Sequence, residues 1–326
     1  MSRQTIKNRI TVRSAVDTAQ TETISLAQHK QDQWFRILFR IRGSVVVSVI
    51  PRVLVCVIFA AVITGLYAGG IGVSLPVLGN LVPSIVLGLL LVFRTNTAYE
   101  RFWEGRKLWG MLVNTVRNLA RQIWVSIIET SATDQMAKVR VLKLLVAFAI
   151  AVKLHLRDEL PDAEMGALLT PEQLDKLHSM HHPPIEIAFW IADYLQDQHD
   201  RGHLNTYQLA SMIALLDRMV DVLGGCERIL KTPIPLAYSI HLKQLVLIYC
   251  LALPFQLVET LGWSTPLIVG LISFTIFGIE EIGIEIENPF GHHSNDLPLD
   301  DICRTMHRNI QDLITLAPSC SQWRSR

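Results

Sequence analysis

Residues 53–93 read VLVCVIFAAVITGLYAGGIGVSLPVLGNLVPSIVLGLLLVF and contain no charged side chain. A membrane-spanning helix needs about 20 apolar residues at a rise of about 1.5 Å each, so this stretch is long enough for two helices and a connection. Glycines between positions 69 and 72 place the connection near the middle. We therefore expect two spans, at about 46–68 and 77–96, joined by a short uncharged outer loop.

Basic residues flank this apolar pair on both sides. Before it stand Arg36, Arg40, Arg42 and Arg52, and after it stand Arg94, Arg101, Arg106 and Lys107. Because lysine and arginine concentrate on the cytoplasmic side of membrane proteins, both ends of the pair are expected there, and with them both chain termini. The first thirty residues lack the apolar core of a signal peptide, so the first span is expected to stay in the cell (inner) membrane of a multi-pass protein.

The charged stretch 100–230 cannot cross a membrane, and its apolar residues recur at helical spacing. Prolines punctuate it, which predicts a cytosolic domain of several helices. Beyond it, Pro233–Val258 is apolar apart from one histidine and one lysine, and Leu261–Ile279 is long enough to span. We expect a second membrane hairpin here, and a soluble pair of buried helices is the alternative.

These patterns predict an all-α, polytopic membrane protein with four transmembrane helices and a helical cytosolic domain. The expected order is a cytosolic N-terminal segment with an interfacial helix (1–45), a first transmembrane hairpin (46–96), a cytosolic helical domain (97–232), a second transmembrane hairpin (233–283), and a cytosolic loop with a C-terminal helix (284–326). The interfacial helix is expected at Trp34–Arg42 and the C-terminal helix at Leu299–Leu316. Half of the residues are hydrophobic and 18% are charged, and the net charge of +1 argues against a nucleic-acid partner.

Four separated blocks of sequence carry a family resemblance. They read WFRILFRIRGSVV at 34–46, FRTNTAYERFWEGRKLWG at 93–110, GGCERILKTPIPLAY at 224–238 and ENPFGHHSNDLPLDDICRTMHRNI at 287–310. In these blocks the chain resembles the bacterial bestrophin-like proteins, which are related to plant thylakoid anion channels and animal bestrophins. The resemblance implies a homopentamer in a lipid membrane, with one central ion pathway, an apolar neck lined by the second span, and a further constriction in the cytosol.

Ile85, Leu89 and Phe93 lie four residues apart and so share one face of the second span. Any span rich in leucine and isoleucine shows such a stripe, so the spacing alone favours ordinary packing. The resemblance matches Phe93 and the arginine after it to the end of the family's neck, and so implies that the three residues form this neck. Five copies of each would narrow the pathway until an ion must deform its hydration shell.

The resemblance places the cytosolic constriction in the segment before GGCERI, which here is the helical stretch Leu204–Met219. Because GGCERI leads back to the membrane, the start of this helix is expected to lie farthest from it. Leu204 is the first candidate for a residue that points into the pathway, and Leu209 is the second. An ordinary core leucine is the alternative for either position.

Glu280, Glu281 and Glu285 lie at the inner end of the fourth span, with Glu287 close behind. A buried network of ion pairs with the arginines after the second span is the favoured interpretation. The alternative is an acidic ring that attracts cations to the vestibule, which matters because some bacterial relatives are thought to pass cations.

The block that follows the fourth span matches the loop that binds Ca²⁺ in animal members. Calcium takes about six to eight oxygen ligands. Asn288, Asp296 and Glu285 remain as oxygen ligands here, but His292 and His293 stand where the animal loops are richer in oxygen, and imidazole is a poor calcium ligand. A structural turn capped by Asn288 and Asp296 is therefore the favoured interpretation, and a calcium site is the alternative.

Two groups of histidines suggest a transition-metal site at first sight. They are His178, His181 and His182, and then His199 and His203. They lie beside prolines or in a charged segment, so solvated or locally hydrogen-bonded histidines are favoured. No P-loop, nucleophile elbow or zinc-protease motif occurs in the sequence, so we expect neither catalysis nor a cofactor.

The sequence as a whole predicts a pentameric channel that passively conducts small inorganic ions, above all chloride and other anions. A sodium-selective cation channel of the same fold is the first alternative. More distant alternatives are a membrane-bound metal-dependent enzyme that uses the glutamates with His292 and His293, and a scaffold without transport.

Overall fold

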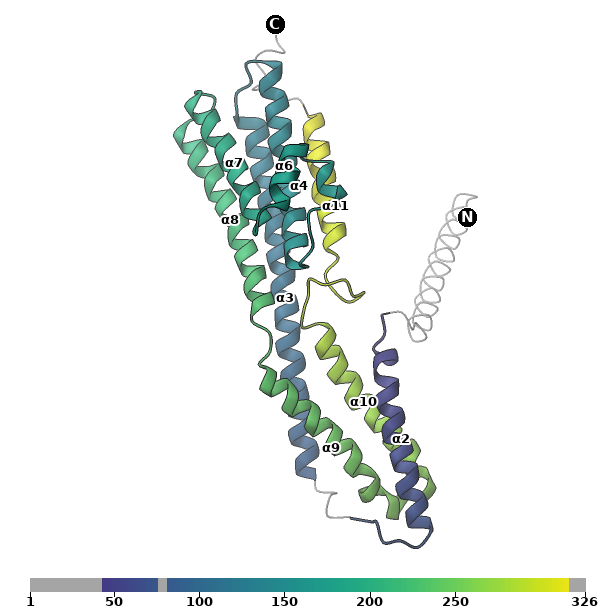
Figure 1. The fold of residues 1–326 in the computed structure, drawn as a ribbon. Coiled ribbons are helices and arrows are strands. Elements are labelled where there is room, and N and C mark those ends of the chain that lie inside the picture. Colours follow the sequence, from purple (N-terminus) through teal and green to yellow (C-terminus); the bar gives the residue numbers. More distant parts are fainter. Residues whose placement is uncertain (1–42, 76–80, 317–326) are drawn as a thin grey trace, which may run out of the picture.

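The computed structural model describes residues 43–75 and 81–316, and every regular element in these ranges is a helix (Figure 1). The elements are α2 (Val46–Ala68), α3 (Leu81–Ser126), α4 (Ala132–Leu156), α5 (Ala163–Gly166), α6 (Pro171–His178), α7 (Pro183–Asp200), α8 (Thr206–Lys231), α9 (Leu236–Leu261), the 3₁₀ turn η2 (Gly262–Ser264), α10 (Thr265–Glu285) and α11 (Leu299–Thr315). The all-α fold is thus confirmed. The expected interfacial helix at Trp34–Arg42 lies outside the described residues.

Three helical segments of the described chain are long and apolar enough to cross a membrane. They are Val46–Ala68, Val82–Ser126 and Leu236–Glu285. The first has the bounds expected from the sequence. The third is 50 residues long and contains two helices, α9 and α10, which meet at the turn η2.

One end of the molecule is an apolar bundle made of α2, α9, α10 and the first part of α3 (Figure 1). Its buried cluster consists of Val49, Cys56, Ala60, Leu87, Leu91, Leu242, Val246, Cys250, Leu253, Val269 and Phe277. A Cβ atom on Gly270 would lie 2.8 Å from Val57 Cγ2, so α10 approaches α2 closely only because position 270 is glycine. Small residues that permit such close contact are the usual means of helix packing in lipid.

Helix α3 is continuous over 46 residues and joins the apolar bundle to the rest of the molecule. The change from apolar to charged sequence at Arg94 marks a change in the surroundings of the helix and not its end. No proline follows Pro83 in this helix, so nothing in the covalent chain interrupts its hydrogen bonding. The boundary that the sequence predicts between the first transmembrane hairpin and the cytosolic domain, at residues 96 and 97, therefore falls within one helix.

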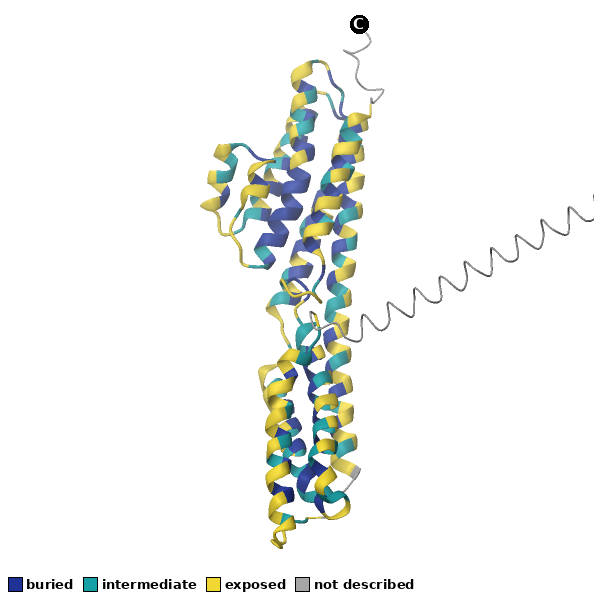
Figure 2. Cartoon of the chain, turned by 90° about the vertical axis from the view of Figure 1, so that its right-hand side faces the viewer, coloured by how far each residue is buried: buried dark blue, intermediate teal, exposed yellow. Residues whose placement is uncertain are grey.

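The other end is a polar bundle made of α4–α8, α11 and the second part of α3. Helix α4 lies inside it, and nearly all of its residues from Val141 onward are buried. Figure 2 shows the buried residues of this bundle in dark blue. The amphipathic C-terminal helix expected at Leu299–Leu316 is confirmed as α11, which packs against α3 and α4. The polar bundle thus holds the larger of the two apolar cores, around Trp109, Trp124 and Phe148.

A buried polar cluster fixes the start of α4. Ser131 and Asp134 form a capping box, and Asp134 also pairs with Arg201 at 2.7 Å. Burial opposes ionisation of Asp134, but hydrogen bonds from Thr130, Arg201 and Ser131 more than offset it and hold its pKa well below the usual value. Near it, Lys138 Nζ lies 2.8 Å from Glu129 Oε1, and both side chains are 0% exposed.

Candidate functional site

The apolar part of α3 presents a stripe of large side chains on the face turned away from its own bundle. Ile85, Leu89 and Phe93 are 52%, 52% and 61% exposed, whereas Leu87 and Leu91 on the opposite face are buried. Exposed apolar residues of this size need a covering surface, which in a membrane is either lipid or another protein copy. The stripe is therefore available to line a pathway between copies of the chain.

The residue after the stripe turns into the protein. Arg94 is 3% exposed, and its Nη2 lies 3.4 Å from Glu287 Oε2. Two turns farther along, Arg101 donates hydrogen bonds to the backbone oxygens of Glu287, Ile229 and Thr232. These contacts fasten α3 to the ends of α8 and α10, and they fix the direction in which the stripe faces.

The acidic residues at the end of α10 have separate partners. Glu281 Oε2 pairs with Arg52 at 2.8 Å, and Glu285 Oε2 accepts a hydrogen bond from Asn295 at 2.5 Å. Glu280 is buried, and its Oε1 has no hydrogen-bond partner among the described residues. The arginine partner of Glu281 comes from α2, and the arginine after the second span binds Glu287 instead.

The loop between α10 and α11 is a compact turn. Asn288 Oδ1 accepts from the Phe290 amide (3.2 Å), and Asp296 Oδ2 accepts from the His293 amide (2.8 Å). A Cβ atom on Gly291 would lie 2.7 Å from Asp296 Oδ2, so the carboxylate packs directly on the glycine backbone. The Phe290 side chain is fully buried and holds the turn against the polar bundle.

A family model described as bacterial and fungal bestrophin protein matches residues 25–312, which include the stripe, the ion pairs and the capped turn. The chain belongs to the bestrophin family.

Named relatives align with most of this bestrophin. A voltage-dependent anion channel-forming protein of Nostoc sp. is 62% identical over 286 residues, which are 88% of this chain and 93% of the relative. The protein of that description from Escherichia coli K12 is 34% identical over 279 residues, which are 85% and 90% of the two chains. A crystal structure of a bestrophin homologue from Klebsiella pneumoniae matches with a TM-score of 0.75 and 32% identity, over 82% of this chain and 99% of the other.

The matching loop of animal bestrophins binds calcium. The turn of this bestrophin does not fit a calcium ion. Arg157 donates hydrogen bonds to the carbonyl oxygens of Phe290 and Gly291, both at 3.1 Å. A cationic guanidinium therefore lies where carbonyl ligands would face the ion. Within the described part of the turn, Asp296 Oδ1 is the side-chain oxygen that is buried without a hydrogen-bond partner, whereas calcium takes six or more oxygen ligands.

We expect ion conduction by this bestrophin to be independent of calcium, because Arg157 competes for the carbonyl oxygens of the turn. Currents recorded from purified protein in a planar bilayer should stay the same when excess EGTA is added and when calcium is then restored. The variant Arg157→Ala should lower thermal stability without making the current depend on calcium. Loss of current in EGTA and its recovery with calcium would contradict the conclusion that calcium does not fit this turn.

The burial of Leu204, the first candidate for the cytosolic constriction, favours the alternative of an ordinary core leucine at this position. Leu204 is 3% exposed and belongs to the core of the polar bundle. It directly precedes Asn205, which caps α8 in a capping box with Gln208, and Leu209 is the fourth residue of that helix. Residues at these two positions of a helix often pack against each other as a hydrophobic staple. Leu209 is half-buried against the same core.

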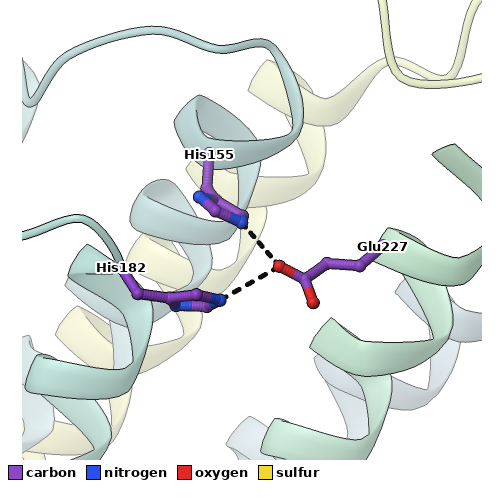
Figure 3. Close-up of side chains that lie close together, drawn as sticks. All are labelled: His155, His182 and Glu227. Atoms are coloured by element: carbon purple, nitrogen blue, oxygen red, sulfur yellow. Dashed lines mark hydrogen bonds and ion pairs between the residues drawn. The ribbon is translucent and has the colours of Figure 1, made fainter. Parts of the chain in front are cut away.

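The histidines are arranged differently from the groups suggested by the sequence. His178 is exposed, His199 lies near Asp200 and Thr206, and His203 Nδ1 lies 3.0 Å from Gln198 Oε1. His182 instead meets two residues from distant parts of the chain, His155 and Glu227 (Figure 3). Sequence reasoning missed this cluster because its members stand far apart in the chain, on or beside three separate helices.

Proposed function

We propose that five copies of this chain surround a central pathway and pass small inorganic anions, chloride among them, through a neck made by Ile85, Leu89 and Phe93. The observation that carries this proposal is the exposed apolar stripe on α3, which ends where Arg94 turns inward. The description of relatives as voltage-dependent anion channel-forming proteins favours a pathway, and not lipid, as the surroundings of this stripe. A ring of such side chains controls ion passage by its width and by dewetting.

The charges near the neck support anions over cations. Glu281 and Glu287 are compensated by Arg52 and Arg94 within the same chain, so these acids do not form a free negative ring. Glu285 is held by Asn295 at the turn. A cation channel of this fold would need acidic groups that face the pathway without a basic partner, and Glu280 is the acid that such a channel would use. Leu209 remains our candidate for the second constriction.

Reversal potentials in asymmetric NaCl test the proposed selectivity. With purified protein in a planar bilayer, the zero-current potential should move toward the chloride equilibrium potential, because anions carry the current. A shift of the opposite sign would establish the cation channel instead. Protein-free bilayers and the variant Glu280→Gln serve as controls, and the variant should keep the sign of the wild type.

The proposed topology has four crossings of a cell membrane, by α2, the apolar part of α3, α9 and α10, with the polar bundle and both termini in the cytoplasm. Arginine pairs at the boundary between the two bundles support this orientation.

Cysteine labelling tests the topology, because the four described native cysteines are buried. In a Cys320→Ser background, Gly72→Cys lies in the loop after α2, where a Cβ atom meets nothing within 4 Å. Leu160→Cys lies in the polar bundle at a position that is 75% exposed. The two cysteines should react with a membrane-impermeant maleimide from opposite sides of the membrane, and labelling from one side would refute the proposed number of crossings.

A further inference from the structure

Three side chains from separate helical segments converge in the polar bundle (Figure 3). His155 stands on the last turn of α4, His182 directly precedes α7, and Glu227 lies on α8. Glu227 Oε1 lies 2.6 Å from His155 Nε2 and 3.0 Å from His182 Nε2, and one donor atom from each of the three residues lies within 4.8 Å of the others. The two imidazole rings face each other with their centroids 4.4 Å apart.

We propose that His155, His182 and Glu227 form a binding site for a divalent transition-metal ion of the zinc class. Two imidazole nitrogens and one carboxylate oxygen are a ligand set that zinc accepts in a tetrahedral site, with water as the fourth ligand. The same set is poor for calcium and magnesium, which prefer oxygen ligands alone. All three ligands belong to the polar bundle of one chain, so the site does not require a second copy.

The geometry needs only small adjustments to admit the ion. Tetrahedral zinc at about 2.0–2.1 Å from each ligand places neighbouring donor atoms roughly 3.3 Å apart. The present separations of 2.6 and 3.0 Å would therefore have to grow by well under an ångström, which side-chain rotation supplies. His182 Nε2 contacts Glu227, whereas Nδ1 of this ring is buried without a hydrogen-bond partner among the residues that the structure describes, so Nε2 is the nitrogen presented to the site.

The surroundings allow the ion to enter and to bind a water molecule. The three ligand side chains are partly exposed, and a cavity of about 130 Å³ is lined by His155 together with Asp158, His181 and Pro183. Lys231 Nζ lies 3.7 Å from Glu227 Oε1, but this side chain is largely exposed and can swing into solvent when a cation binds. A bound ion would cross-link α4, α7 and α8 through metal–ligand bonds, in addition to their packing, hydrogen bonds and ion pairs.

The test is the zinc content of the purified full-length protein in detergent. Wild type and the variants His182→Ala, Glu227→Gln and His178→Ala are stripped with EDTA, dialysed against dilute zinc and analysed by atomic emission. Wild type and His178→Ala, which removes an exposed histidine on the neighbouring α6, should each retain one more zinc ion per chain than the other two variants. Cobalt in place of zinc should give the visible absorption of a tetrahedral site in the same two proteins only.

Equal zinc contents in all four proteins would overturn the proposal. Glu227→Gln is nearly isosteric, so it keeps the test decisive if His182→Ala elutes as misfolded protein on gel filtration. The zinc content is measured without ion conduction, so the two proposals are tested independently. Absence of bound zinc would not contradict the proposed channel function, and absence of current would not contradict the metal site.

Discussion

Replacing Ile85, Leu89 and Phe93 together with alanine is expected to raise the single-channel conductance several-fold while the protein still assembles. In the proposed neck, an ion loses hydration against five copies of each side chain and gains no ligand in return, so a wider ring lowers the barrier. The chain itself covers less than half of each of these side chains, so their truncation should leave its own packing largely intact. Bilayer recordings measure the conductance, and native mass spectrometry in mild detergent should find five chains per particle in both wild type and variant.

The matched control lies on the opposite face of the same helix. Leu87→Ala with Leu91→Ala removes buried side chains from the apolar bundle and should cost roughly 2–5 kcal/mol for each residue, with loss of assembled protein. The neck assignment fails if the triple variant assembles with unchanged current. It also fails if this variant misfolds as the control does. A dominant monomer or dimer in the wild-type spectrum would refute the pentamer.

The second large effect is expected at the buried ion pair of the polar bundle. Lys138→Met removes the cation that lies 2.8 Å from Glu129 Oε1, and also a donor to the Ile127 carbonyl oxygen at 2.6 Å. Because the carboxylate stays behind in a fully buried place, the loss should be about 3–5 kcal/mol. For a chain of this size that corresponds to a fall in the thermal midpoint on the order of 10 °C.

Lys143→Met is the control for this effect, since Lys143 stands on the same helix but is exposed. It should change the thermal midpoint by no more than a degree or two. The double variant Lys138→Met with Glu129→Gln should recover much of the lost stability, because the uncompensated charge is then gone. Equal midpoints for the two lysine variants would show that the buried pair contributes little.

Hydropathy and glycine placement were enough to predict the first span, because a long uncharged and apolar helix is stable only where its side chains are removed from water. The predicted bounds 46–68 are those of α2. The C-terminal helix was predictable for a related reason, since its apolar residues recur on one face and pack on the polar bundle. In both segments the local pattern and the final packing agree.

Other features depend on contacts that sequence order does not reveal. The drop in hydropathy at Arg94 reports where the surroundings of α3 change, but it carries no information on where the helix ends. Leu204 was ranked by its distance from the membrane, whereas its burial follows from its position one residue before the cap of α8. The approach of His155 to Glu227 spans 72 positions and depends on how α4 packs near α8.

Because α3 is continuous, it fixes how the apolar bundle is rotated about the helix axis relative to the polar bundle. Its 46 residues form a rod about 70 Å long, anchored by Arg94 and Arg101 on one side and by the core around Trp109 on the other. Inserting one residue between these anchors would rotate one end of the helix against the other by about 100°. The stripe would then face away from the proposed pathway, although both cores could still form. Natural length variation in this helix should therefore be confined to whole turns, whereas the loops beside it can vary freely.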